Sequence, residues 1–302
     1  MRNSSSLFRI LVVSLFLPGY INAQKGLSFH QAEDSLKTLN NKIQNSDNDS
    51  VKIKLNSIFF ATLKEVLTVP GAYRYPFDSI HSMGKIVSPD NKFRILNWNL
   101  LLQNGSNRYF AIIEMAGNLH QRTGYFVLTD VSDTMERPEI KRLDADHWYG
   151  ALYYKIIWKK CDTVNLYTLL GWDGYSHEMT QKIIDVLSFD IRGNPVFGAP
   201  LFRNRGNGKN MRILFKYSAS GTMILRYEEQ KLTTRKTWNP RKKVFEFHSE
   251  KADLIVCDRL IPLEPSFEGL YQFYVPAGDV YDGFIFTKCA WEFVEKVDAR
   301  NN

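Results

Sequence analysis

The side chains best able to do chemistry in this chain are cationic, and they are concentrated in one stretch. Between residues 203 and 243, twelve basic residues are accompanied by only two acidic ones, whereas acidic residues outnumber basic ones elsewhere. The twelve are Arg203, Arg205, Lys209, Arg212, Lys216, Arg226, Lys231, Arg235, Lys236, Arg241, Lys242 and Lys243. Concentrated positive charge attracts anions, so this basic segment predicts a surface for an anionic glycan, a lipid headgroup or an acidic protein. The alternative is a solvated hairpin with dispersed charges.

Two loops are expected to hold most of this charge. The first is centred on the Gly-Asn-Gly sequence at residues 206–208, and the second covers residues 231–243. They flank a predicted hairpin, residues 213–217 with 223–227, so we expect them to project together. The candidate binding residues are Arg203, Arg205, Lys209, Arg235, Lys236, Trp238, Arg241, Lys242 and Lys243.

The sequence Gly-Trp-Asp-Gly at residues 171–174 offers a second kind of chemistry. Glycine on each side of Trp172 and Asp173 suits a tight turn that exposes an aromatic ring beside a carboxylate. Ligand pockets use aromatic faces with a few placed polar groups, so Trp172 and Asp173 are candidate residues for binding a glycan. The alternative is a turn at a strand end with Trp172 packed inward.

Two carboxylates and an imidazole, Asp144, Asp146 and His147, lie just before a predicted strand. This group is a weak candidate for a divalent cation site or for acid–base chemistry, because aspartates in loops more often cap turns. Together with Asp173, these carboxylates define the rival hypothesis, a carboxylate-dependent hydrolase.

Motifs of the common enzyme classes are absent from the sequence. There is no Gly-x-Ser-x-Gly nucleophile elbow and no P-loop, and His177-Glu178 lacks the second histidine of the zinc-protease helix. The sequence therefore assigns no catalytic residue and no cofactor, and it favours a non-enzymatic protein.

Three cysteines, Cys161, Cys257 and Cys289, leave at least one thiol unpaired. Cys257 and Cys289 both fall in the carboxy-terminal β region, so they are the pair considered for a disulfide. The alternative is that these thiols are packed like small apolar side chains. Their spacing fits no zinc motif.

The elements that must position these groups change character near residue 88. Apolar residues at steps of three and four predict two amphipathic helices between residues 28 and 68. From Ser88 onward the period is two, with an Asn-Gly turn between the runs 93–98 and 109–115. About eleven short strands without a long helix predict a mainly β fold, an antiparallel meander that is either propeller-like or a twisted sandwich. The stretch 181–187 fits a helical turn or a strand.

The first 23 residues predict where the protein goes. Two arginines precede an apolar run at residues 10–17, and a Pro-Gly pair and small residues then lead to Ala23. This is the pattern of a cleaved secretory signal, with cleavage expected before Gln24. The run is too short to span a bilayer, and no later stretch is long and apolar enough to be a transmembrane segment.

The predicted organisation is therefore a signal peptide at residues 1–23, a helical hairpin at 24–70 and an antiparallel β domain at 71–302. The expected setting is the periplasm or the cell envelope, with a soluble chain after cleavage. In that setting an anionic glycan, a lipid headgroup or an acidic envelope protein is the expected partner. Nucleic acid is not, because no nucleic-acid-binding motif accompanies the positive charge.

Several segments also resemble a known group of sequences. They are residues 88–99, 169–174, 182–187, 193–198 and 295–301. Together they resemble a family of exported, uncharacterised proteins of Bacteroidetes-type bacteria, over roughly residues 80–301. The resemblance implies a cell-envelope setting, and it transfers no activity and no functional residue.

Overall fold

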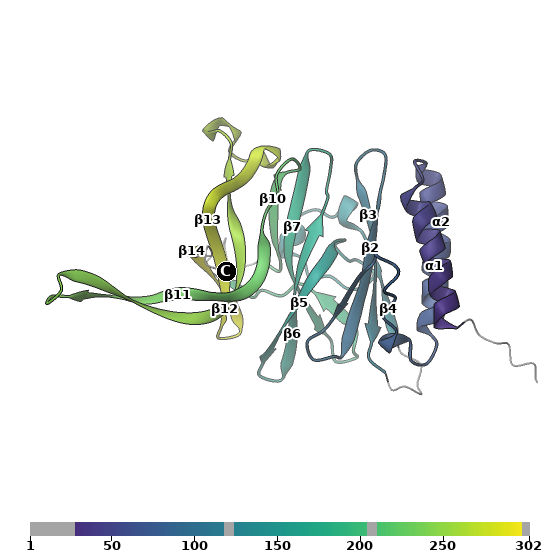
Figure 1. The fold of residues 1–302 in the computed structure, drawn as a ribbon, viewed down its shortest axis with the longest axis horizontal. Helices are drawn as coiled ribbons and strands as arrows, with labels where there is room; N and C mark the ends of the chain where they lie inside the picture. Colours follow the sequence, from purple (N-terminus) through teal and green to yellow (C-terminus); the bar gives the residue numbers. More distant parts are fainter. Residues whose placement is uncertain (1–27, 118–123, 204–209, 298–302) are drawn as a thin grey trace, which may run out of the picture.

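The computed structural model describes residues 28–117, 124–203 and 210–297. Figure 1 shows a layered arrangement in chain order: a helical hairpin, then three β-sheets, the last of which continues into a long two-stranded arm. The prediction of a mainly β fold with an amino-terminal helical hairpin is confirmed. The predicted signal peptide lies outside the described residues.

The helical hairpin covers the first sheet. It consists of α1 (Phe29–Gln44) and α2 (Asp49–Leu67). Ser28 begins α1 with a capping box, in which its hydroxyl accepts the Gln31 amide while the Gln31 side chain accepts the Ser28 amide. Leu36 and Leu63 are buried on the hairpin face that packs against the sheet. Among the described residues, neither helix is long and apolar enough to cross a membrane.

Both faces of the first sheet are covered. Its strands, in the order β1-β2-β3-β4, are β1 (Gly84–Val87), β2 (Phe93–Leu101), β3 (Asn107–Met115) and β4 (Tyr125–Thr129). Successive strand residues point to opposite faces. Along β2, Phe93 and Ile95 therefore join the core shared with the second sheet, whereas Leu96 and Trp98 join the core under the helices.

The second sheet lies between the other two. Its strand order is β10-β7-β6-β5, with β8 beside β7, and the bounds are β5 (Leu152–Cys161), β6 (Val164–Asp173), β7 (Met179–Phe189), β8 (Pro195–Phe197) and β10 (Ile213–Ser218). On β6, Leu169 packs toward the first sheet and Leu170 toward the third. The ambiguous stretch 181–187 is part of strand β7.

The third sheet closes the stack. Its strand order is β11-β12-β13-β14-β9, with bounds β9 (Phe202–Arg203), β11 (Leu225–Asn239), β12 (Val244–Pro262), β13 (Tyr274–Thr287) and β14 (Ala290–Val297). β9 runs parallel to β14, and the pairings of the other strands in this sheet are antiparallel. Short 3₁₀ helices lie at η1 (Ala72–Arg74), η2 (Ser132–Thr134), η3 (Pro138–Ile140), η4 (Pro265–Phe267) and η5 (Tyr271–Phe273).

The strand pairing differs from the prediction in two respects. The described residues form fourteen strands in three sheets rather than one meander of about eleven. The predicted hairpin of residues 213–217 with 223–227 is wrong, because β10 pairs with β7 and β11 pairs with β12. Phe215 and Leu225, one from each run, meet in the core between the second and third sheets. The two runs thus pack face to face instead of edge to edge.

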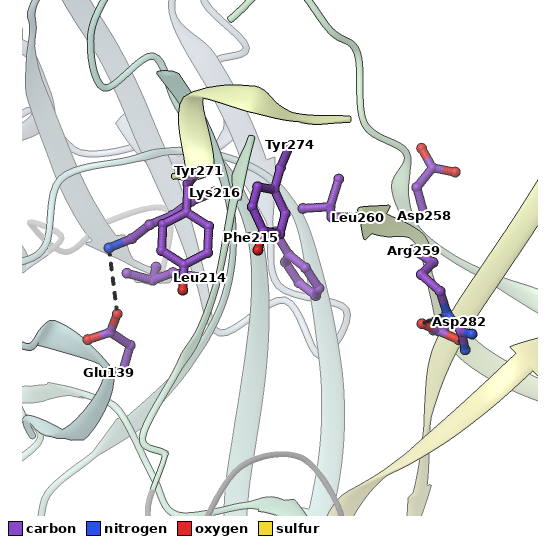
Figure 2. A pocket seen from close by; sticks show the side chains of 10 residues that line it. All are labelled: Glu139, Leu214, Phe215, Lys216, Asp258, Arg259, Leu260, Tyr271, Tyr274 and Asp282. Atoms are coloured by element: carbon purple, nitrogen blue, oxygen red, sulfur yellow. Dashed lines mark hydrogen bonds and ion pairs between the residues drawn. The ribbon is translucent and has the colours of Figure 1, made fainter. Parts of the chain in front are cut away.

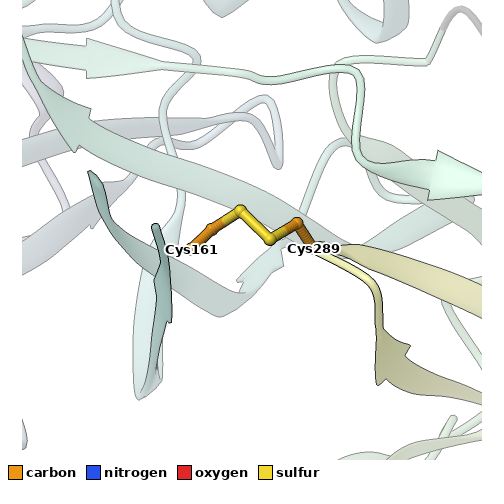
Figure 3. Close-up of a disulfide and its surroundings, with 2 residues drawn as sticks. All are labelled: Cys161 and Cys289. Carbon is orange, nitrogen blue, oxygen red and sulfur yellow. A yellow bond between two sulfur atoms is a disulfide. The ribbon is translucent and has the colours of Figure 1, made fainter. Parts of the chain in front are cut away.

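A disulfide fastens the second sheet to the third (Figure 3). It joins Cys161, at the end of β5, to Cys289, in the turn between β13 and β14, with the two Cα atoms 5.5 Å apart. The considered pairing of Cys257 with Cys289 is wrong. Cys257 lies on β12 inside the core, where its thiol donates to the Asp282 carbonyl oxygen. Cys257 is therefore packed like a small apolar side chain, as the alternative expected.

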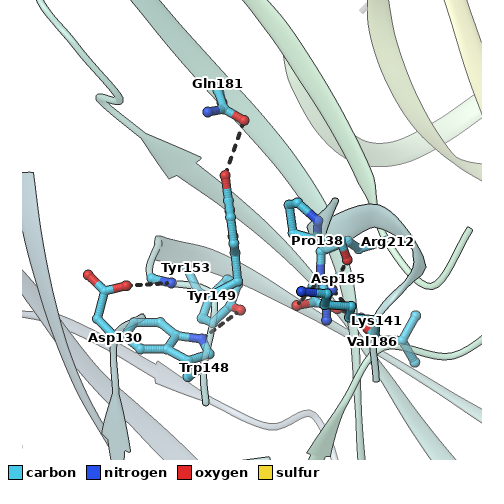
Figure 4. Close-up of polar contacts among 11 residues, drawn as sticks. Asp130, Pro138, Lys141, Trp148, Tyr149, Tyr153, Gln181, Asp185, Val186 and Arg212 are labelled. Carbon is cyan, nitrogen blue, oxygen red and sulfur yellow. Dashed lines mark hydrogen bonds and ion pairs between the residues drawn. The ribbon is translucent and has the colours of Figure 1, made fainter. Parts of the chain in front are cut away.

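One cation of the basic segment is inside the protein. The Arg212 side chain is fully buried, and its Nε donates to Asp185 at 3.1 Å. Its Nη1 donates to the carbonyl oxygens of Pro138 and Lys141 (Figure 4). Arg212 therefore neutralises a buried carboxylate and adds nothing to a positive surface.

Candidate functional site

Strands β11 and β12 extend beyond the third sheet as a two-stranded arm, visible as the long projection in Figure 1. β12 pairs with β13 only from Leu254 onward, so residues 229–253 pair with each other alone. Ten paired positions and one bulge residue, Thr234, at about 3.3 Å each give the arm a length of about 35 Å. The prediction that residues 231–243 form a loop is wrong, because most of them belong to β11 and only residues 240–243 make the turn.

The turn at the end of the arm presents three consecutive cations. The Asn239 side-chain oxygen accepts the backbone amides of Arg241 and Lys242, each at 3.1 Å, which is how asparagine stabilises a turn. Lys243 closes the turn with φ of 54°. Arg241, Lys242 and Lys243 are all exposed.

An aromatic pair lies directly beside this turn. Trp238 and Phe245 are opposite each other in the strand register, with ring centroids 5.0 Å apart. Trp238 is 49% exposed, Phe245 50% and the neighbouring Val244 48%. Cross-strand aromatic pairs stabilise a ribbon, and this one leaves half of its apolar surface in contact with solvent.

The positive charge of the arm increases from its base to its tip. Residues 231–251 include two acidic residues, Glu246 and Glu250, and seven basic ones: Lys231, Arg235, Lys236, Arg241, Lys242, Lys243 and Lys251. In the register Arg235 is opposite His248 and Lys236 is opposite Phe247. Toward the base, the Glu229 carboxylate lies 2.6 Å from the Lys251 ammonium and raises the pKa of that lysine. We call residues 229–253 the basic arm.

The other predicted basic loop is not part of this surface. Arg203 lies on β9, at the opposite edge of the third sheet from β11, with Glu292 4.0 Å away. Arg205 and Lys209 lie outside the described residues. Lys216 lies in a groove 3.9 Å from Glu139. The basic segment of the sequence is thus divided, and the arm alone concentrates its charge.

Trp172 and Asp173 point to different surroundings, because they are neighbours on strand β6. Trp172 is half-buried and lines a groove of about 560 Å³ together with His177, Gln103 and Lys52. Several polar groups of this groove already have protein partners, such as the Lys52 ammonium, which donates to the Leu101 carbonyl oxygen. The predicted tight turn is wrong, because Trp172 and Asp173 are the last two residues of strand β6. The Trp172 ring is only partly exposed, and the buried Asp173 does not line the groove beside it.

Asp173 is a buried acid between the first and second sheets. Its carboxylate accepts the Tyr109 hydroxyl at 2.8 Å, and that hydroxyl in turn accepts the Gly174 amide. Burial raises the pKa of Asp173 to about 7, and the Tyr109 hydrogen bond offsets only part of this. Nearby, the Tyr149 hydroxyl donates to the side-chain oxygen of Gln181 (Figure 4).

Asp144 and Asp146 line a different cavity, of about 630 Å³, which they share with Asp190. Asp144 caps its own turn, since its Oδ1 accepts the amides of Asp146 and His147 and lies 2.9 Å from the His147 ring nitrogen. The His147 hydrogen bond lowers the pKa of Asp144. In the described ranges, no three His, Cys, Asp or Glu side chains are placed to hold a metal ion.

One groove was not predicted from the sequence (Figure 2). It has a volume of about 280 Å³ and lies where β10 approaches β12 and β13. Its charged side chains are matched: Arg259 donates to Asp282 through two nitrogens, and Lys216 lies 3.9 Å from Glu139. The paired acidic and basic residues come from segments that are distant in the sequence, so no local sequence pattern predicts this groove.

Phe245 and Val244, at the tip of the arm, were also missed. The available signal is the alternation Phe245-Glu246-Phe247, which places apolar residues at every second position just after the turn. Read together with Trp238 before the turn, it predicts a hairpin with an aromatic pair.

Comparison with family models, with curated proteins and with solved structures finds no match for this chain.

Proposed function

We propose that this protein is a non-enzymatic binding module of the cell envelope that holds an anionic partner through its basic arm. The observation that carries the proposal is the arm itself, a ribbon of about 35 Å with seven basic and two acidic residues in positions 231–251. A two-stranded ribbon is marginally stable on its own, and the apolar contacts of this one with the core, made by Leu232 and Ala252, lie near its base. Its exposed cations therefore make sense as a contact surface.

The carboxylates support a non-enzymatic reading. A glycosidase needs two carboxyl groups on either side of one substrate bond. Asp173 lies outside the cavity that Asp144, Asp146 and Asp190 share, and Asp190 accepts two backbone amides of its own turn. Asp144 is engaged in capping its turn. The rival hypothesis, a carboxylate-dependent periplasmic hydrolase, has weaker support for these reasons.

The disulfide supports the proposed export. Stable disulfides form in oxidising compartments such as the periplasm, and the Cys161–Cys289 pair joins two sheets of the folded body. The signal pattern at residues 1–23 and this pairing point to the same setting.

Charge removal at the tip tests the proposal. The triple variant Arg241→Gln, Lys242→Gln, Lys243→Gln should bind the soluble polyanion dextran sulfate at least tenfold more weakly than the parent chain. Added salt should weaken the parent's binding, because exposed charges are screened within about 8 Å at physiological ionic strength. Binding would be measured by isothermal titration calorimetry.

The matched control removes three exposed cations from the helical hairpin at the other end of the molecule, in the variant Lys37→Gln, Lys42→Gln, Lys54→Gln. This control should bind like the parent. Equal loss in both triple variants, or a parent chain that binds no polyanion, would overturn the proposal.

A further inference from the structure

We infer that the tip of the basic arm inserts Trp238, Phe245 and Val244 into the surface of an anionic lipid bilayer, while the cations of the turn contact the headgroups. This inference rests on the proposed function and names the partner of the same site. It assigns membrane insertion to the aromatic pair, whereas the proposed function involves only the cations.

The first argument is where the apolar surface lies. Trp238, Val244 and Phe245 are each about half exposed, and all three flank the turn at the far end of the arm. An aromatic pair that served only to hold the ribbon together would do so equally well near the base. Tryptophan favours the membrane–water interface because its ring is apolar and its indole N–H remains hydrated.

The second argument is the shape of the tip. In the described part of the chain, no residue of the arm lines any of the five grooves and cavities of about 150 to 630 Å³ on the body of the protein. Small ligands and short glycans are held in concave sites that surround them, whereas a narrow ribbon end is convex. A bilayer surface accepts a convex apolar tip, because the headgroups and acyl chains move apart around it.

The third argument is charge complementarity. Arg241, Lys242 and Lys243 directly adjoin the apolar residues and are all exposed. Each basic side chain near an anionic lipid surface raises affinity by about fivefold. Cations next to exposed aromatic residues are the combination by which peripheral proteins bind anionic membranes. The acidic residues of the arm, which are Glu229, Glu246, Glu250 and Asp253, lie on β11 and β12 outside the turn.

The test uses vesicles of phosphatidylglycerol and phosphatidylethanolamine beside dextran sulfate. The variant Trp238→Ala, Phe245→Ala should bind the vesicles at least tenfold more weakly than the parent, while its dextran sulfate affinity falls by no more than about twofold. Trp238→Phe keeps an apolar ring and should retain most of the vesicle binding. The control Val51→Ser, Ile58→Ser removes two exposed apolar residues of α2 and should bind vesicles like the parent.

Insertion also has a direct optical signature. Lipids with brominated acyl chains should quench the parent's fluorescence more than that of Trp238→Phe, since the other tryptophans stay away from the bilayer. Unchanged vesicle binding in the double alanine variant, or equal quenching in both proteins, would overturn insertion and leave the proposed function standing. Failure of the parent to bind either vesicles or dextran sulfate would overturn the proposed function itself.

Discussion

The second sheet and the basic arm are both made of antiparallel strands, yet the burial of their faces is opposite. In the second sheet, Leu169 and Leu170 on β6 each enter a separate core, so both faces are buried. In the arm, Trp238 and Phe245 touch each other and remain half exposed. Both faces of the second sheet are thus covered by other parts of the protein, whereas the aromatic side chains of the arm are exposed to a partner.

The same contrast applies to charge. Arg212, directly before β10, is completely buried and is matched by Asp185 and by two carbonyl oxygens. Arg241 at the end of the arm is exposed. Two arginines of one basic segment thus have opposite roles: Arg212 holds the η3 segment against β7, and Arg241 is available to a partner. The following predictions test this division, beginning with the largest expected effect on stability.

Removing the buried cation Arg212 should lower the free energy of unfolding the most. Arg212→Ala leaves Asp185 charged and unmatched inside the protein, and it should lower the free energy of unfolding by about 3–5 kcal/mol. Arg241→Ala, the matched change on the arm, should alter it by less than about 0.5 kcal/mol. Urea denaturation of both variants measures the difference. Similar losses in the two would contradict the division.

The disulfide should contribute about as much. Cys161→Ser opens a link between residues that are 128 positions apart, and the loop-entropy relation then gives a loss of about 5 kcal/mol. Cys289→Ser should have the same effect, and the double variant should lose no more than either single one. Peptide mapping should find Cys257 outside any disulfide. A mapped bond between Cys257 and Cys289 would refute the pairing.

Asp173 should make the body less stable as the pH rises. The folded state holds its proton up to about pH 7, and the unfolded chain releases it near pH 4, to within about a unit. Between these values the folded state binds more protons, so the unfolding free energy should fall by about 4 kcal/mol from pH 4 to 8. Asp173→Asn should remove most of this slope, and Asp146→Asn, an exposed control, should keep it. An equal slope in the parent and in Asp173→Asn would contradict the buried acid.

Shortening the arm should have the smallest effect on stability. Lys231 and Lys251 are opposite each other in the register, so an Asn-Gly turn can replace residues 232–250 between them. The free energy of unfolding should fall by only about 1 kcal/mol, the contribution of a half-buried leucine, because Leu232 is lost from the edge of a small core cluster at the base of the arm. Loss of the folded state in this variant would show that the arm is needed for folding.

Much of the body could be predicted because its signals are local. Steps of three and four residues located the two helices, and Asn104-Gly105 located the turn between β2 and β3. The pairing of the strands and the stacking of the sheets could not be predicted. A period of two identifies a strand, but it does not say which other strand pairs with it. For that reason residues 213–217 and 223–227 were paired with each other when they belong to different sheets.

The site was only partly predictable for a related reason. Residues 231–243 were taken for a loop because a strand without a core is polar on both faces, as a loop is. The cations and Trp238 were identified from composition, whereas Phe245 needed the hairpin register. Arg212 was wrongly counted toward the positive surface, because amino-acid composition does not distinguish a buried cation from an exposed one.

Binding of the shortened chain to phosphatidylglycerol vesicles tests the central claim most directly. The chain in which Asn-Gly replaces residues 232–250 should keep the parent's melting temperature to within a few degrees and bind the vesicles at least tenfold more weakly in a sedimentation assay. A folded, shortened chain that binds these vesicles as tightly as the parent would contradict the assignment of binding to the arm.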